Sequence, residues 1–257
     1  MKKGINTPWG PIGEFVFKRT YARRLDENDV NSPTETFEQT IDRVVKALNT
    51  QLRMDLTEKE QDKVREILLS LRGMVAGRFL WQLGTKTVDR LGLLSLQNCA
   101  ACVIDDPVEP FVWAFEALML GSGVGYNAQL KNVYSLPPVK KVSISHQNTK
   151  DANFIVPDSR EGWVILLRKV LESHFKTGED FTYSTILVRG AGEVIKGFGG
   201  TSSGPGILIN GITKIHNLLN SRAGNKITPT DAVDIMNIIG TIVVAGNVRR
   251  SAQTAIS

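Results

Sequence analysis

The chain has 257 residues, of which 42% are hydrophobic and 22% charged, and its 31 basic and 26 acidic residues give a net charge of +5. These proportions are those of an ordinary soluble domain and exclude intrinsic disorder and a collagen-like structure. No apolar run reaches the roughly 18 residues of a membrane span, and no apolar segment of a secretion signal follows the start. Since two cysteines cannot form a disulfide framework, we expect a cytoplasmic protein with reduced thiols.

The N-terminal part predicts an arm and a helical region. Residues 1–32 are polar and rich in turn-forming residues, so we expect an extended arm. Two amphipathic helices follow within residues 33–73, and the second begins with a capping box of Thr57 and Glu60.

From residue 74 to 257, short apolar runs alternate with amphipathic helices. Strands are predicted at 96–104, 124–128 and 182–188, and helices at 108–120, after Asp158-Ser159, from Pro205 and from Thr228-Pro229. Such alternation is typical of an α/β fold with parallel strands covered by helices. Residues 247–257 predict one more strand, which is either an edge strand or frayed tail, or a sign that the fold continues in another polypeptide.

Cys99 and Cys102 form a C-x-x-C pair with several possible roles. They could pack as small apolar residues, act as a redox pair at a helix N-terminus, or supply half of a zinc site. The zinc site is disfavoured because His146, His174 and His216 lack ligand spacing.

Strand geometry argues against a disulfide between these two cysteines. In an extended segment, Cys99 and Cys102 point to opposite faces, and their Cα atoms lie about 10 Å apart. A disulfide needs Cα atoms within about 7 Å. If Cys99 is redox-active, its partner sulfur must therefore come from outside this chain.

Two glycine-rich segments could approach a ligand closely. Residues 189–205 combine backbone amides and hydroxyls with the positive charges of Arg189 and Lys196, ahead of a helix that begins at Pro205. A loop of this kind before a helix is a natural anion or nucleotide site, although many such loops are only flexible. It does not match the P-loop motif. The second segment, GSGVG at 121–125, follows a helix.

Several motifs together resemble the adenosylcobalamin-dependent (class II) ribonucleotide reductases, especially the monomeric triphosphate reductase type. They are GRFLWQLGT (77–85), QNC (97–99) with IDD (104–106), LMLGSGVGY (118–126), DSREGW (158–163), KGFGGTSSGP (196–205) and AGNVRRSA (245–252). The resemblance implies a helical region followed, over residues 74–257, by the first half of a ten-stranded α/β barrel made of two parallel five-stranded halves. It also implies that this half-barrel is incomplete without a partner chain.

The resemblance also implies roles for individual residues. Cys99 would be one of two redox cysteines that reduce the 2′ position of the substrate, whereas Cys102 falls where the family has an apolar residue. Asn98, Ser122 and Gly123 match positions that line the substrate.

Residues 190–204 resemble the specificity loop that reads a bound effector. The residues implied for the effector and its loop are Arg189, Lys196, Gly197, Gly199, Gly200, Thr201 and Ser202, with Asp105 and Lys131 as weaker candidates that could equally be surface charges.

The family's thiyl-radical cysteine, its second redox cysteine and its C-terminal cysteines have no counterpart in this sequence. The resemblance implies that adenosylcobalamin, bound mainly by the missing part or at the interface, generates the radical. We therefore expect the N-terminal chain of a split reductase acting on ribonucleotides, with triphosphates favoured, completed by a C-terminal reductase chain. A deoxynucleotide effector and an external dithiol such as thioredoxin are the other expected partners, with no nucleic acid and no membrane.

Two alternatives stay open. The chain could be a catalytically silent, nucleotide-binding regulatory module, or a fragment of an intact reductase interrupted by an intein or otherwise shortened.

Overall fold

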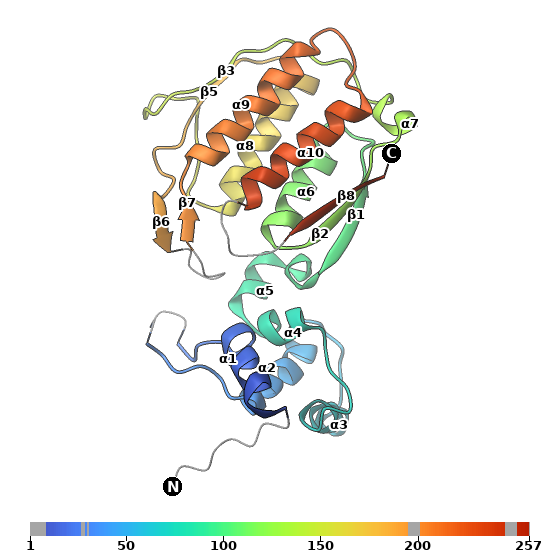
Figure 1. The fold of residues 1–257 in the computed structure, drawn as a ribbon, viewed down its shortest axis with the longest axis vertical. Coiled ribbons are helices and arrows are strands. Elements are labelled where there is room, and N and C mark those ends of the chain that lie inside the picture. The colour runs from blue at the N-terminus through green and yellow to red at the C-terminus, as the bar shows by residue number, and fades with distance from the viewer. Residues whose placement is uncertain (1–8, 27–28, 30, 195–200, 245–250, 257) are drawn as a thin grey trace. The chain divides into compact units, whose positions relative to one another are not determined.

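The computed structural model describes residues 9–26, 29, 31–194, 201–244 and 251–256. The chain divides into two compact units, Met1–Gln97 and Asn98–Ser257, and each is described by itself (Figure 1). Among the described residues, the helices are too short or too polar to cross a bilayer.

The first unit is helical. Its elements are α1 (Gly10–Thr20), α2 (Phe37–Thr50), α3 (Glu58–Leu69), α4 (Gly77–Gln82), α5 (Lys86–Leu91) and the 3-10 helix η1 (Leu93–Leu96). The predicted capping box of Thr57 and Glu60 opens α3, and Thr36 with Gln39 forms a second one at α2.

The N-terminal segment differs from the extended arm that the sequence predicted, because helix α1 lies within residues 1–32. Its Phe17 is 5% exposed and packs edge-on against Phe37, with ring centroids 5.6 Å apart. Trp9 packs on the same ring at 4.4 Å. Burial of these aromatic rings stabilises a helix whose glycines give it a weak intrinsic propensity.

The boundary between the units also differs from the expected one after residue 73. The apolar side chains of Leu80, Leu83, Val88 and Leu96 belong to the same core as those of α2. Arg43 of α2 adds hydrogen bonds to this segment, donating to the Leu80 carbonyl at 2.9 Å. Residues 74–97 therefore pack with the helical unit.

The second unit is α/β, as predicted. Its elements are β1 (Cys99–Val103), α6 (Glu109–Met119), β2 (Gly123–Asn127), α7 (Leu130–Val133), β3 (Ile144–His146), β4 (Phe154–Ile155), α8 (Arg160–Glu172), the π-helix η2 (Ser173–Thr177), β5 (Phe181–Ser184), β6 (Ala191–Val194), β7 (Thr201–Ser203), α9 (Gly206–Ser221), α10 (Pro229–Val244) and β8 (Ala252–Ile256).

The strands of this unit form three separate sheets. One is parallel with the order β1-β2-β8, a second is parallel with the order β3-β5-β4, and β6 pairs antiparallel with β7. In the described residues the first sheet thus has three strands, whereas the half-barrel implied by the resemblance has five. The glycine-rich segment, expected to be a loop, forms the β6–β7 hairpin in its described part.

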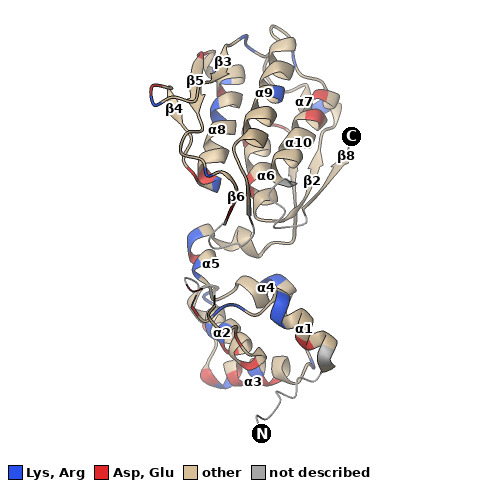
Figure 2. Cartoon of the chain, turned by 60° about the vertical axis from the view of Figure 1, so that its left-hand side comes forward, with Lys and Arg blue, Asp and Glu red and all other residues tan. Residues whose placement is uncertain are grey.

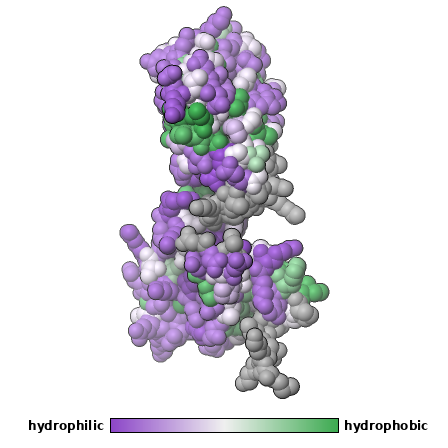
Figure 3. All heavy atoms as spheres, turned by 90° about the vertical axis from the view of Figure 1, so that its left-hand side faces the viewer, coloured by the Kyte–Doolittle hydropathy of each residue, from purple (hydrophilic) through white to green (hydrophobic). Residues whose placement is uncertain are grey.

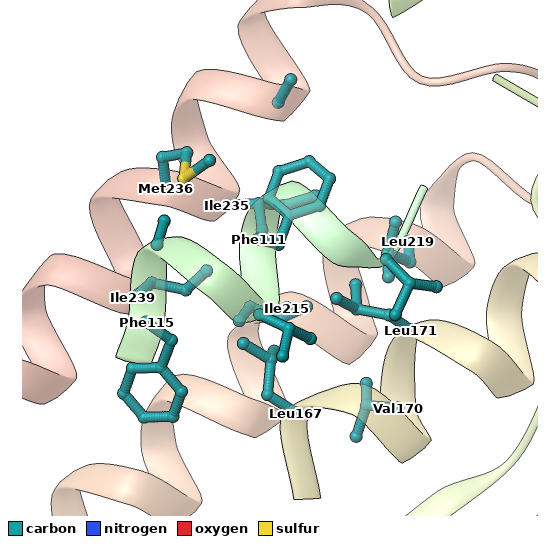
Figure 4. Packing of buried hydrophobic residues seen from close by; sticks show 14 of the residues in the cluster. Phe111, Phe115, Leu167, Val170, Leu171, Ile215, Leu219, Ile235, Met236 and Ile239 are labelled. Atoms are coloured by element: carbon teal, nitrogen blue, oxygen red, sulfur yellow. The ribbon is translucent and has the colours of Figure 1, made fainter. Parts of the chain in front are cut away.

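The core of the second unit lies between helices on one side of the β1-β2-β8 sheet. Figure 4 shows Phe111 and Phe115 of α6 packed among residues of α8, α9 and α10. Val124 and Tyr126 of β2 are buried against this core, while the alternate residues of the strand are only partly buried. The sheet therefore has one covered face and one open face.

Candidate active-site wall

Cys99 lies on the open face of the β1-β2-β8 sheet. It is the first residue of β1, and its side chain is exposed and unbonded. Ala101 and Val103 share this face and are exposed too, whereas Ala100 and Cys102 point to the other side. As the strand geometry predicted, Cys99 and Cys102 do not form a disulfide.

Cys102 has the opposite surroundings. Its side chain packs against the hydrophobic core. Burial, and to a smaller extent the negative charge of Asp105, raises the pKa of the Cys102 thiol to about 11. Because the thiolate is the nucleophilic form, this raised pKa makes Cys102 a poor nucleophile near neutral pH.

Small residues surround the sulfur of Cys99. Cys99 lies in register with Gly123 of β2, which in turn lies in register with Ala252 of β8. A methyl group on Gly123 would lie 3.8 Å from the Cys99 Sγ and 3.7 Å from the Asn98 carbonyl oxygen. The absence of a side chain at Gly123 therefore keeps one side of the sulfur open.

The predicted substrate residues meet at this corner of the sheet, with one difference among them. The Gly123 amide donates to the Asn98 carbonyl at 2.8 Å, which joins the starts of β1 and β2. Asn98 is exposed next to Cys99, whereas Ser122 is fully buried and its amide donates to the Ala117 carbonyl at 3.0 Å. In this chain, Asn98, Cys99 and Gly123 thus form an accessible group. Ser122 is buried next to Gly123 and connects this group to the end of α6 through its backbone hydrogen bond.

The effector candidates are less closely grouped. Arg189 forms an ion pair with Asp158, with its Nε 2.8 Å from the carboxylate Oδ2. Thr201 begins β7, and the hydroxyl of Ser202 accepts a hydrogen bond from the Gly204 amide at 2.9 Å. Lys196, Gly197, Gly199 and Gly200 lie outside the described residues.

Asp105 and Lys131 do not join the hairpin. Asp105 follows the carboxyl end of β1, and Lys131 lies in α7 after β2; both side chains are exposed. Figures 1 and 2 place α7 well apart from β6. The structure therefore does not bring these two residues together with the specificity-loop candidates.

The fold brings together two histidines that their spacing in the sequence did not connect. The Nε2 of His174 lies 3.0 Å from the Nδ1 of His216, between η2 and α9. Both rings form hydrogen bonds with the protein, and in the described part of the chain no cluster of three or more potential ligands could hold a metal ion. We assign this pair to the fold of the unit rather than to the site.

Ion pairs between α6 and α8 were also missed by sequence reasoning. Arg160 contacts Glu116 at 2.6 Å, and Arg168 contacts Glu109 with its Nη2 2.8 Å from Oε2. Partners so far apart in the sequence leave no local signal, since charged residues on helices are usually solvated.

Two family models match the chain. The ribonucleotide reductase alpha domain matches residues 1–85, and the insertion domain of B12-dependent ribonucleotide reductase matches residues 127–219. The second match begins at the end of β2 and finishes in α9, so it contains the β3-β5-β4 sheet and the hairpin. Sequence reasoning did not separate this domain from the rest of residues 74–257.

Similar curated proteins are longer than this chain. The adenosylcobalamin-dependent ribonucleoside-triphosphate reductase of Euglena gracilis is 35% identical over 262 residues, covering 95% of this chain and 34% of its own length. That of Lactobacillus leichmannii is 33% identical over 316 residues, covering 100% of this chain and 42% of its own length. The chain thus spans less than half the length of these relatives.

A solved structure agrees with these relatives. The crystal structure of a B-12 dependent (class II) ribonucleotide reductase superimposes with a TM-score of 0.77 and 28% identity, over 94% of this chain and 41% of that one. The sequence and the fold therefore agree: the chain belongs to the adenosylcobalamin-dependent (class II) ribonucleotide reductase family.

Proposed function

We propose that this chain supplies one wall of the active site of an adenosylcobalamin-dependent ribonucleoside-triphosphate reductase, with Cys99 as one of its two redox cysteines. The observation that carries the proposal is the exposed Cys99 thiol on an open sheet face, next to a glycine that leaves the sulfur accessible. Asn98 and Gly123 would contact the ribonucleotide next to Cys99, and the buried Ser122 would hold the backbone of Gly123 in place.

The reaction consumes two thiols for each nucleotide. A thiyl radical on a cysteine outside this chain removes the 3′ hydrogen of the ribose, and the 2′ hydroxyl then leaves as water. Cys99 and a second thiol supply two electrons and two protons and become a disulfide, and the 3′ hydrogen is returned. An external dithiol such as thioredoxin would reduce that disulfide by exchange, which suits a cytoplasmic location.

The histidines of this chain, which are possible ligands for the cobalt of adenosylcobalamin, form hydrogen bonds within the protein. The ring nitrogens of His174 and His216 are engaged in protein hydrogen bonds, and His146 bonds to the Thr185 hydroxyl at 3.0 Å. We propose that the cofactor is held mainly by the other part of the reductase or at the junction with it, where it would generate the thiyl radical.

A C-terminal reductase chain is the proposed partner. Support comes from the open face of the sheet, where Val103 of β1 is 41% exposed and Ile256 of β8 is 57% exposed. Both residues lie in register with Asn127 of β2, which is the strand between them. Apolar side chains on a face that also carries an exposed thiol are suited to being covered by another wall of the same site.

The hairpin of β6 and β7 is the proposed regulatory element. Thr201 and Ser202 belong to its described part and Arg189 lies just before β6, and a deoxynucleotide effector is the proposed ligand. Asp105 and Lys131 stay weaker candidates, because Lys131 belongs to α7, which lies well apart from β6 (Figures 1 and 2).

The test is turnover by this chain combined with the C-terminal chain, adenosylcobalamin, a ribonucleoside triphosphate and a dithiol. Cys99→Ser should abolish steady-state formation of deoxynucleotide. Cys102→Ser, the matched control, should retain most of it because that thiol is partly buried and points to the core side of the sheet. Turnover at the normal rate by Cys99→Ser would contradict the proposal. Binding of deoxynucleotide without any turnover would instead favour the regulatory module, and a native mass that shows one longer polypeptide would favour the fragment.

A further inference from the structure

Two ion pairs join α6 to α8, one towards each end of α6. Arg168 contacts Glu109 in the first turn of α6, and Arg160 contacts Glu116 near its last turn, with Nη1 2.6 Å from Oε1. The Arg160–Glu116 pair is the less exposed one, since the Arg160 side chain is 16% exposed and that of Arg168 33%. The same two helices thus carry a pair close to the substrate wall and another far from it.

The Arg160 end of α8 also holds the base of the β6–β7 hairpin. The Nε of Arg189, which precedes β6, donates to both carboxylate oxygens of Asp158, at 3.1 and 2.8 Å. Asp158 lies directly before Ser159, whose hydroxyl caps α8 by accepting from the Gly162 amide at 3.0 Å. Figure 2 shows charges of both signs at this end of α8, near β6. The base of the hairpin is therefore bonded to Asp158, which directly precedes the capping residue of α8 and lies two positions before Arg160.

The Glu116 end of α6 leads directly into the substrate wall. The Leu120 amide donates to the Glu116 carbonyl at 3.1 Å, and the Ser122 amide to the Ala117 carbonyl at 3.0 Å. The next amide, that of Gly123, donates to the Asn98 carbonyl beside Cys99. The last turn of α6 thus fixes the backbone that leaves the sulfur open.

We propose that the Arg160–Glu116 ion pair transmits the state of the hairpin to the backbone at 121–123, which makes Arg160 and Glu116 positioning residues for substrate selection. The inference rests on the proposed function, in which the hairpin reads a deoxynucleotide and the wall holds the ribonucleotide. A guanidinium with two short contacts suits this role because its planar donors fix direction as well as distance. Arg160 indeed contacts Glu161 as well, at 2.9 Å.

The experiment measures substrate selectivity in the reductase assembled with its C-terminal chain. The quantity is the ratio of kcat/KM for two ribonucleoside triphosphates, with and without a deoxynucleoside triphosphate. In Arg160→Lys and Glu116→Gln, the change of this ratio caused by the deoxynucleotide should fall about 3- to 10-fold, in the range found for mutations between coupled sites. The double variant should lose no more than either single one, because both remove the same contact.

The second ion pair provides the control. Arg168→Lys and Glu109→Gln break a contact between the same helices, so they should affect thermal stability to a comparable extent and keep the full effector response. A response that all four variants keep, or that all four lose equally, would overturn the inference while the proposed function stands. A wild-type reductase that is inactive or ignores the deoxynucleotide would overturn the proposed function and this inference with it.

Discussion

The two cysteines lie three residues apart, and the alternation of a strand gives them different chemistry. Cys102 faces the core, where burial raises the pKa of its thiol to about 11. Cys99 faces the open side of the sheet. Sequence reasoning could separate them because the side-chain period of a strand is two residues, whatever the neighbouring strands do.

The neighbourhood of Cys99 could not be derived in the same way. That Gly123 lies beside Cys99 depends on the register between β1 and β2, which are joined through α6. Register is set by packing of the covered face against the helices, and no local sequence pattern encodes it. The glycine-rich segment 121–125 was expected to approach a ligand closely, but only the resemblance to known reductases placed Gly123 at the same site as Cys99.

Gly123→Ala should lower activity without unfolding the chain. Its added methyl group would meet ordinary van der Waals distances, 3.8 Å from the Cys99 Sγ, so stability should change by less than about 1 kcal/mol. The methyl group would occupy the open side of the sulfur, and kcat/KM of the assembled reductase should fall at least about 10-fold because the substrate is displaced.

Gly125→Ala is the matched control for this variant. Its methyl group would lie on the same face of β2, 3.6 Å from the Ala101 Cβ. Gly125 lies in register with Ala101, two residues after Cys99, so this methyl group lies farther from the sulfur. Thermal unfolding and steady-state kinetics of both variants decide the matter. Equal losses of activity would show that the space beside Cys99 has no special role.

Among the elements, helices with strong local signals were predicted well and those stabilised by distant contacts were not. Thr57 and Ser159 cap α3 and α8 as expected. Helix α1 was missed because its stability depends on Phe17 packing against Phe37, which follows 20 positions later in the sequence. The hairpin strands were missed because glycine density predicts a loop, and the strands β6 and β7 are short.

A hydrogen-bonded chain of side chains links η2, α9 and the segment before β3. The Lys140 carbonyl can only accept, so the His174 Nδ1, 3.1 Å away, carries a proton. His174 Nε2 then accepts from His216 Nδ1, and His216 Nε2 accepts from the Asn220 amide at 3.2 Å. Asn220 is oriented by donating to the Val142 carbonyl and accepting from its amide. The network is complete only when both rings are neutral.

Stability should therefore fall in acid. Burial lowers the pKa of His174 from 6.5 to about 4 and also lowers that of His216. As the pH falls below about 6.5, the histidines of the unfolded chain bind protons, whereas His174 in the folded chain stays neutral until about pH 4. The contribution of this pair to the free energy of unfolding is therefore complete above about pH 6.5 and is lost towards pH 4. For His174 the difference corresponds to about 3 kcal/mol.

Urea unfolding at a series of pH values measures this effect. His174→Gln should flatten the dependence between about pH 4.5 and 7. His146→Gln should leave most of it, since the pKa of His146 is lowered by burial alone in a more exposed position. The same slope in His174→Gln as in the wild-type chain would show that the buried pair does not control acid stability.

At the scale of the whole molecule, the second unit exposes apolar side chains on part of its surface. Figure 3 shows a largely hydrophilic exterior with apolar patches. The large apolar residues that are exposed in this unit are Val103, Leu130, Tyr134, Ile165, Ile186, Leu187 and Ile256. Two of them, Val103 and Ile256, lie on the open face that carries Cys99.

The chain by itself should self-associate, and the C-terminal reductase chain should suppress this by covering the open face. Light scattering after size exclusion should show concentration-dependent association of the chain alone and a defined complex after mixing. Val103→Thr should weaken both. Leu187→Thr removes an apolar group that is more exposed, at 61% against 41%, but lies outside the strands of this sheet, so it should leave complex formation intact. A stable monomer that ignores the second chain would contradict the proposed assembly.

The assignment of Cys99 is tested most directly by locating the disulfide formed in a single turnover. The assembled enzyme is fully reduced, freed of external dithiol, given adenosylcobalamin and a ribonucleoside triphosphate, and then quenched with an alkylating reagent for peptide mapping. We predict that Cys99 is recovered in a disulfide with a cysteine of the C-terminal chain, in proportion to the deoxynucleotide formed, and that Cys102 is recovered as a free thiol. Deoxynucleotide formed while Cys99 stays free would contradict the account.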